Sequence, residues 1–327
     1  MARVYSETHA PVSSHSGDRV MTNPFFGQDV LSIKEMTLQQ IELVLHAAAQ
    51  LKKAKPQDLL KGKIIANCFF EPSTRTRLSF ESAALKLGGR VIGFASDESL
   101  STKKGETLYD TMRVVSSYSD LIVIRHPKEG SARLAAEASS VPVINAGDGA
   151  NQHPTQTLVD LFSIQESQGS LEGLSVALVG DLKYGRTVHS FAQACRLFNI
   201  RLFLVAPETL TLPDDICDTL KREGVRFSFH QTLEEVIHKV DVVYMTRIQK
   251  ERMPSSEYQA SKDKLTLKLE MLAKAKKNLR ILHPLPRVDE IDTAIDDTPF
   301  SYYFQQAENG VFIREALLTL ILNEKLS

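Results

Sequence analysis

Short apolar runs alternate with amphipathic segments along most of this chain. Four apolar runs in the first half predict strands, at Lys63–Phe70, Arg90–Phe94, Leu121–Arg125 and Val141–Asn145. Five more predict strands in the second half, at Leu174–Val179, Leu202–Ala206, Arg226–Phe229, Val242–Met245 and Leu279–Leu282. Strands that alternate with helical patterns are typical of parallel sheets covered by helices, so the pattern predicts an α/β fold.

Helical periodicity occupies several of the intervals between these runs. The apolar positions of one such helix are spaced by three and four residues, at Phe80, Ala83, Ala84 and Leu87. Gly88-Gly89 ends that pattern. We expect further helices at Val188–Phe198, Asp214–Glu223 and Leu233–His238. The apolar faces of these helices belong to the core.

A run of polar donors directly follows the first apolar run, in the sequence Glu71-Pro72-Ser73-Thr74-Arg75-Thr76-Arg77. The pattern predicts a strand, a tight turn and a helix N-terminus. A helix N-terminus favours an anion, and arginine adds a planar, permanently charged donor that suits phosphate. An ordinary helix cap needs only one hydroxyl residue. We therefore interpret the run as a phosphate-binding turn that differs from the P-loop and from the dinucleotide glycine loop.

Further polar motifs also follow predicted strands. They are Arg125-His126-Pro127, His153-Pro154-Thr155-Gln156, Asp181-Leu182-Lys183-Tyr184-Gly185-Arg186, Thr246-Arg247-Ile248-Gln249-Lys250-Glu251-Arg252 and His283-Pro284-Leu285-Pro286-Arg287. Ligands of parallel α/β folds bind at the carboxyl ends of the strands, so these motifs are candidates for one site. Gly180 follows a strand, but no second or third glycine completes a dinucleotide fingerprint, which argues against a nicotinamide-dependent oxidoreductase.

Composition limits the function further. The chain has 327 residues, with 39 Lys+Arg against 40 Asp+Glu, so its near-neutral charge indicates neither nucleic acid nor an anionic membrane as a partner. No apolar run approaches the roughly 20 residues of a membrane span. The three cysteines, Cys68, Cys195 and Cys217, are far apart, which fits a reducing cytoplasm and predicts small buried apolar residues. Residues 1–20 are polar, without a signal-peptide core, and we expect either a disordered extension or an upstream start codon that is not used.

The Ser-Thr-Arg-Thr-Arg run resembles the carbamoyl-phosphate signature of the aspartate and ornithine carbamoyltransferases. The motifs that begin at His153, Asp181, Thr246 and His283 follow it in the order of that family. The resemblance extends roughly from residue 21 to the C-terminus. It is strongest to the bacterial aspartate carbamoyltransferase catalytic chains that associate with regulatory chains.

The resemblance implies two doubly wound parallel-sheet domains with the active site in the cleft between them. Residues 21–153, together with a C-terminal helix that returns at about 307–327, are expected to form the carbamoyl-phosphate-binding domain. Residues 154–306 are expected to form the aspartate-binding domain. The implied reaction transfers the carbamoyl group of carbamoyl phosphate to L-aspartate, giving N-carbamoyl-L-aspartate and phosphate, the committed step of de novo pyrimidine biosynthesis. Such catalysis depends on positioning and charge stabilisation, so no cofactor and no metal are expected.

The resemblance also assigns residues to carbamoyl phosphate. The phosphate is implied to bind to Ser73, Thr74, Arg75, Ser101 and Lys104. The developing charge on the carbonyl oxygen is implied to be stabilised by Thr76, Arg125 and His153. The carbamoyl amide is implied to be oriented by Gln156 and to donate to the carbonyls of Pro284 and Leu285. A cis Leu285–Pro286 bond would aim those carbonyls into the cleft.

For aspartate, the resemblance assigns the α-carboxylate to Arg186, the side-chain carboxylate to Arg247 and the α-amino or carboxylate region to Gln249, with Lys104 as a further contact. Lys104 and Ser101, with Ser99 as the alternative serine, lie in a loop that each subunit is implied to lend to its neighbour's site. The expected assembly is therefore a homotrimer, joined in a larger allosteric complex by zinc-bearing regulatory chains that bind nucleotide effectors.

Each of these motifs also has a purely structural interpretation. Arg125 could solvate the end of a strand, His153 could cap a helix, the run after Thr246 could be a solvated loop, and Pro286 could simply end a strand. Asp148 and Asn151 are expected to hold a loop rather than to contact substrate, and His126 is expected to be structural.

Two other functions remain as alternatives. An ornithine carbamoyltransferase would have to accept a second cationic amine, which Arg247 disfavours, and the Asp-x-x-x-Ser-Met-Gly and His-Cys-Leu-Pro patterns of that enzyme are absent. A non-catalytic scaffold would be marked by loss of Arg75, Lys104, His153 or Arg247, and the chain has all four.

Overall fold

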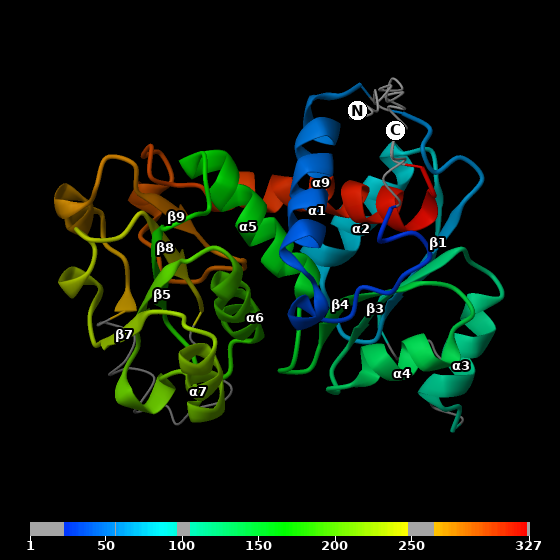
Figure 1. Cartoon of the computed structure of the whole chain (residues 1–327), viewed down its shortest axis with the longest axis horizontal. Coiled ribbons are helices and arrows are strands. Elements are labelled where there is room, and N and C mark those ends of the chain that lie inside the picture. The colour runs from blue at the N-terminus through cyan, green and yellow to red at the C-terminus, as the bar shows by residue number, and fades with distance from the viewer. Residues whose placement is uncertain (1–22, 56, 97–104, 248–264, 326–327) are drawn as a thin grey trace, which may run out of the picture.

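The chain forms two lobes, each built around one parallel sheet (Figure 1). A computed structural model describes residues 23–55, 57–96, 105–247 and 265–325. The first sheet has four strands in the order β2-β1-β3-β4, and the second has five in the order β7-β6-β5-β8-β9. In each sheet the chain moves outward from a central strand in both directions. The predicted fold class, two doubly wound parallel sheets, is therefore confirmed.

The strands of the first sheet are β1 (Ile64–Phe69), β2 (Arg90–Phe94), β3 (Leu121–His126) and β4 (Val143–Asp148). Those of the second are β5 (Ser175–Val179), β6 (Arg201–Val205), β7 (Phe227–His230), β8 (Val242–Met245) and β9 (Arg280–Leu282). Every predicted strand is present, with its ends shifted by a few residues at most.

The α-helices are α1 (Leu38–Lys53), α2 (Thr74–Lys86), α3 (Leu108–Ser116), α4 (Ser131–Ala138), α5 (Pro154–Gln168), α6 (Arg186–Ala194), α7 (Asp214–Arg222) and α9 (Tyr303–Leu322). Short 3-10 helices are η1 (Ile33–Glu35), η4 (Cys195–Leu197), η5 (Glu208–Leu210), η6 (Leu233–Glu235), η8 (Leu269–Lys274) and η9 (Thr293–Ile295).

The helix predicted at Leu233–His238 is wrong. Only η6 forms there, and Val236 leaves helical geometry with φ −126°. Thr232 and Glu235 cap this single turn reciprocally, but a segment this short cannot offset the cost of helix nucleation with further backbone bonds. Its apolar side chains are buried all the same, which is why their spacing imitates a helix.

Alternating side chains of β1 divide the core into two clusters. Ile65 and Phe69 belong to a large cluster that continues into the second lobe, whereas Ala66 and Cys68 belong to a smaller cluster under α3 and α4. All three cysteines are buried free thiols, as predicted.

Two helices connect the lobes. α5 leaves the first sheet and leads into the second, and α9 returns from the second lobe to pack against α1 and α2 (Figure 1). Asn23 fixes the far end of α9 by donating to the Leu320 carbonyl oxygen at 2.6 Å. The expected return of the C-terminal helix is thus present, while the residue bounds of the two domains stay a prediction.

Candidate active site

The phosphate-binding turn predicted after β1 is the first turn of α2. Ser73 occupies the N-cap position in extended geometry, with φ −156° and ψ 98°, yet within the described chain its side chain makes no capping hydrogen bond. The first turn contains no acidic residue. Among the described residues the Ser73 hydroxyl is therefore not used as a helix cap, and a helix N-terminus of this kind can bind an anion through its backbone N–H groups.

Arg125 at the end of β3 and Arg186 at the start of α6 meet at one carboxylate. Glu71 Oε1 lies 2.8 Å from Arg125 Nη2 and 3.0 Å from Arg186 Nη2. Burial, and next the charge of Arg186, lower the pKa of Arg125 to about 10 although Glu71 opposes the shift. Gly147 has φ +118°, and a Cβ there would lie 3.2 Å from atoms of both guanidinium groups. Because Gly147 has no side chain, the end of β4 can pass close to both guanidinium groups.

His153 is buried at the N-terminus of α5, where Pro154 occupies the first helical position. Its backbone N–H donates to Ser190 Oγ at 3.2 Å. Burial, reinforced by the charges of Arg125 and Arg186, lowers the pKa of the imidazole well below its usual 6.5. His153 is therefore a neutral group that can offer one ring N–H.

The β4–α5 loop that carries His153 is held by Asp148, as expected. Asp148 Oδ2 accepts from Asn151 Nδ2 at 3.0 Å and from the Gly130 N–H at 3.0 Å, while Oδ1 accepts from Asn145 Nδ2 at 2.9 Å. These hydrogen bonds account for the positions of Asp148 and Asn151 without any contact to a ligand.

The segment after β9 forms the opposite wall. The Leu285–Pro286 peptide bond is cis, and Leu285 has φ +56°. The Leu285 N–H donates to His283 Nδ1 at 2.7 Å, and His283 Nε2 lies 2.7 Å from Glu290 Oε1. The cis geometry that the sequence left open is thus present, and the buried His283–Glu290 pair fixes the segment.

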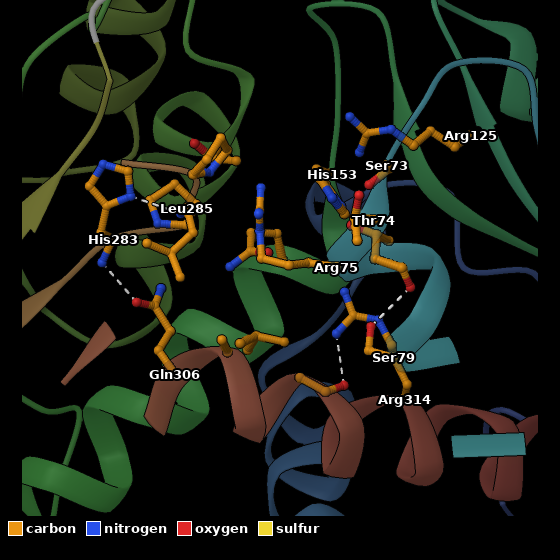
Figure 2. Close-up of a pocket in the computed structure, with 18 of the residues that line it drawn as sticks. Ser73, Thr74, Arg75, Ser79, Arg125, His153, His283, Leu285, Gln306 and Arg314 are labelled. Atoms are coloured by element: carbon orange, nitrogen blue, oxygen red, sulfur yellow. Dashed lines mark hydrogen bonds between the residues drawn. The ribbon is translucent and has the colours of Figure 1, made fainter. Parts of the chain in front are cut away.

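These elements enclose a cavity of about 450 Å³. Of the predicted residues, its lining includes Ser73, Thr74, Arg75, Thr76, Arg125, His153, Gln156, Arg186, Pro284 and Leu285. Figure 2 shows the start of α2 on one side of this cavity and His283, Leu285 and Gln306 on the other. The fold therefore gathers side chains from widely separated parts of the sequence around one space.

A second cavity, of about 620 Å³, adjoins the first. Both cavities share Arg125, Arg186 and the Pro284–Pro286 segment, and Arg247 lines only the second. The predicted residues Ser101 (or Ser99), Lys104 and Gln249 lie outside the described residues.

Several residues that line the two cavities were not assigned from the sequence. The most notable are Arg314 and Gln306 on α9 in the first cavity and Glu71 in the second. Arg314 is fully buried, which lowers its pKa to about 9, and it donates to the Gly310 carbonyl oxygen at 2.7 Å. A single arginine in the apolar stretch from Val311 to Leu322 was a usable signal. Among the residues that the structure describes, no group of three or more His, Cys, Asp or Glu side chains is placed to hold a metal ion.

Two family models together match nearly the whole described chain. Residues 28–166 match "Aspartate/ornithine carbamoyltransferase, carbamoyl-P binding domain", and residues 172–321 match "Aspartate/ornithine carbamoyltransferase, Asp/Orn binding domain".

Curated relatives are similar over almost their full length. An aspartate carbamoyltransferase catalytic subunit of Photobacterium profundum is 58% identical, over 94% of this chain and 100% of the relative. That of Chromobacterium violaceum is 55% identical, over 91% of this chain and 99% of the relative.

Solved structures agree in fold. Aspartate transcarbamoylase from Trypanosoma cruzi in complex with carbamoyl phosphate and aspartate superposes with a TM-score of 0.87 at 38% identity, over 92% of this chain and 97% of the other. The catalytic subunit of the M. jannaschii aspartate transcarbamoylase gives 0.84 at 48% identity, over 89% and 97%. In the described parts of this chain, no helix combines the length and apolar character that crossing a bilayer requires.

Proposed function

The chain belongs to the aspartate/ornithine carbamoyltransferase family, and from this premise we propose that it transfers the carbamoyl group of carbamoyl phosphate to L-aspartate. The products are N-carbamoyl-L-aspartate and phosphate. The family includes both acceptors, but the similar catalytic subunits and solved structures are aspartate enzymes. Pyrimidine synthesis in the cytoplasm is the corresponding cellular role.

The observation that carries the proposal is the chemical asymmetry of the two adjoining cavities. The first combines a helix N-terminus with Arg75 and Arg125, a set of donors suited to a phosphate. The second adds Arg247 to Arg186, two cations suited to the two carboxylates of aspartate. An acyl phosphate and a dicarboxylate would thus meet where the cavities join.

For carbamoyl phosphate, we assign the phosphate to Ser73, Thr74 and Arg75 at the start of α2. The carbonyl oxygen is assigned to Thr76, Arg125 and His153, which line the same cavity. Negative charge develops on this oxygen when the amine attacks, so donors placed there lower the barrier. A neutral His153 serves this purpose because its one N–H can donate without introducing another cation beside Arg125.

The carbamoyl NH₂ is assigned to acceptor groups on α5 and on the segment after β9. These are the side-chain oxygen of Gln156 and the backbone carbonyls of Pro284 and Leu285. Two N–H donors facing fixed acceptors orient the carbonyl carbon toward the second cavity.

For aspartate, Arg186 is assigned to the α-carboxylate and Arg247 to the side-chain carboxylate, with Gln249 and Lys104 as further contacts. An ornithine side chain would place an ammonium group against these cations, which disfavours that acceptor. The aspartate amine attacks in its neutral form, the tetrahedral intermediate collapses with loss of phosphate, and the leaving phosphate is the proposed proton acceptor.

We also propose that active sites are completed between copies of the chain in a homotrimer. Ser101 and Lys104 would be supplied by the neighbour. Exposed apolar side chains on α2 and on the edge strand β2 support an interface there. Leu78 and Leu85 on α2 are 54% and 61% exposed, and Ile92 on β2 is 41% exposed.

The larger assembly and the domain division are further proposals. The relatives are named catalytic subunits, which supports association with separate zinc-bearing regulatory chains that bind nucleotide effectors. The packing of α9 on α1 and α2 supports a carbamoyl-phosphate-binding domain of residues 21–153 with about 307–327, and an aspartate-binding domain of residues 154–306.

Two arginines of one motif provide a matched test of the reaction. Arg75 lines the cavity, whereas Arg77 is paired with Glu81 at 2.7 Å on the surface of α2. With carbamoyl phosphate and aspartate, Arg75→Ala is expected to lose about a hundredfold or more in kcat/KM, as happens when a transition-state donor is removed. Arg77→Ala is expected to stay near wild type. Equal losses in the two variants would contradict the assignment.

A further inference from the structure

Asp160, on α5, is a carboxyl group buried completely behind the wall of the first cavity, and burial raises its pKa to about 7 although the hydrogen bonds from Gln156, Gln306 and Tyr244 oppose the shift. Its Oδ1 accepts from Gln156 Nε2 at 2.8 Å and from Gln306 Nε2 at 2.7 Å. Its Oδ2 accepts from the Tyr244 hydroxyl at 2.9 Å. Two glutamines, one from α5 in the middle of the chain and one from the C-terminal helix α9, therefore turn the same end of their amides toward one oxygen.

This arrangement fixes the polarity of both glutamines. A glutamine amide has a donor end and an acceptor end, and only the NH₂ end can face an oxygen that accepts. The carbonyl ends must then point away from Asp160. For Gln306 the result is visible, because Oε1 accepts the backbone N–H of His283 at 2.8 Å (Figure 2). For Gln156, which lines the cavity, the remaining polar atom is Oε1.

Both glutamines affect the acceptors that we assign to the carbamoyl NH₂. Gln306 holds the backbone of His283, immediately before the Pro284 and Leu285 carbonyls, and Gln156 contributes its own oxygen. We propose that Asp160 is a positioning residue that orients both glutamines, so that only acceptors face the carbamoyl NH₂. The cavity thereby selects an acyl phosphate that carries NH₂ over one that carries a methyl group. This inference rests on the proposed function and adds the origin of its selectivity.

The selectivity follows from hydrogen-bond complementarity. Acetyl phosphate has nearly the shape of carbamoyl phosphate, but its methyl group leaves the fixed acceptors unpaired, which is costly in a desolvated site. If Gln156 could rotate, its NH₂ end would face the carbamoyl NH₂, donor against donor. The pocket would then distinguish the two acyl phosphates poorly.

Asp160 acts through the glutamines and not on the substrate. It does not line either cavity, and its two oxygens already accept from three donors. A role as a general base would require an oxygen within reach of the reacting amine.

The test compares kcat/KM for carbamoyl phosphate and acetyl phosphate, with aspartate as acceptor and phosphate release as the signal. Asp160→Leu keeps the approximate volume but removes the acceptor, so the carbamoyl-to-acetyl ratio is expected to fall roughly tenfold or more. Asp160→Asn retains an oxygen for both glutamines and turns its NH₂ to the Tyr244 oxygen. Its ratio is expected to stay within about threefold of wild type.

Tyr244→Phe is the matched control, because it removes only the bond to Oδ2 and should leave the ratio unchanged. If Asp160→Leu slows both acyl phosphates by the same factor, Asp160 is merely structural and the inference is overturned. A wild-type chain that does not carbamoylate aspartate at all would instead overturn the proposed function.

A neutron crystal structure of the wild-type chain tests the inference without any variant. Deuterons on the Gln156 and Gln306 nitrogens facing Asp160 would support it. An amide oxygen of either glutamine facing Asp160 would contradict it, whether or not Asp160→Leu folds.

Discussion

At the scale of single residues, the cavity wall concentrates positive charge. Arg75, Arg125, Arg186 and Arg314 all line it. Burial lowers the pKa of Arg125 to about 10 and that of Arg314 to about 9, so these cations are held at a cost in solvation. Glu71 offsets part of that cost for Arg125 and also pairs with Arg186. An anionic substrate would offset more, which links affinity for phosphate to the burial of the arginines.

His153 gives a prediction about pH. Its pKa is lowered in the folded chain chiefly by burial and then by the nearby arginines, whereas the unfolded value is about 6.5. The unfolded chain therefore takes up a proton first as the pH falls. The contribution of neutral His153 to stability is present above pH 6.5 and is lost as the pH falls through the lower folded value.

NMR of the imidazole should accordingly show His153 still neutral at pH 6. His189 and His283 have pKa values shifted in the same direction by burial. His153→Gln should therefore weaken the loss of unfolding free energy below pH 6.5 without abolishing it. Protonation of His153 near pH 6.5 would refute the oxyanion role assigned to a neutral imidazole.

Residues that belong to short motifs could be assigned to the site from the sequence. Residues outside any motif, which reach the site only through the fold, were missed. The Ser73–Arg77 run predicted a cradle because its donors are consecutive. Arg314 and Gln306 reach the same cavity from α9, more than two hundred residues later. Arg314 stands out as an arginine in an apolar stretch, but no local pattern shows which cavity α9 reaches, so Asp160, which acts through Gln306, could not have been assigned.

At the scale of elements, the N-termini of α1 and α2 differ in use. Thr37 caps α1 with a capping box, accepting from the Gln40 N–H at 3.2 Å. Ser73 makes no such bond at α2 within the described chain. The two helix starts therefore allow a comparison between a hydroxyl that caps its helix and one that we propose binds phosphate.

We expect Thr37→Ala to lower the free energy of unfolding by about 1 kcal/mol and to leave the KM for carbamoyl phosphate unchanged. Ser73→Ala should do the reverse, with unfolding near wild type and KM raised roughly tenfold, the equivalent of about 1.4 kcal/mol in binding. Urea unfolding and steady-state kinetics measure the two effects. A loss of stability in Ser73→Ala without a change in KM would identify Ser73 as an ordinary cap.

Elements were predictable to the extent that local pattern determines them. The inner strands β1, β3, β5 and β8 are largely apolar because both of their faces are buried, and such runs stand out in the sequence. At Leu233–Glu235 the same kind of burial acts on a single turn, and apolar spacing alone could not separate this turn from a helix.

At the scale of the whole molecule, α5 and α9 join the lobes through one polar cluster. Glu166 on α5 accepts from Lys52 on α1 at 2.6 Å and from Tyr302 and Asn309 at 2.6 and 2.9 Å. The cluster lies where both helices pass between the lobes. A cavity built from both lobes depends on such a connection to keep its walls in register.

The proposed trimer makes a prediction for mixed assemblies. Lys104→Ala removes a residue lent to the neighbour, and His153→Ala removes a residue of the chain's own site. Each variant alone should be nearly inactive. Trimers reassembled from both should regain up to about one third of the wild-type activity, because one of the three interfaces then combines two intact halves. Mixed trimers without activity would show that sites are not shared.

The most direct test of the proposed reaction is product formation by the purified wild-type chain from carbamoyl phosphate, with L-aspartate and L-ornithine offered as separate acceptors. We expect N-carbamoyl-L-aspartate with aspartate and little product with ornithine, because Arg186 and Arg247 present cations to the acceptor. Preference for ornithine would contradict the assignment of the second cavity. Absence of product with both acceptors would contradict carbamoyl transfer and favour a non-catalytic scaffold.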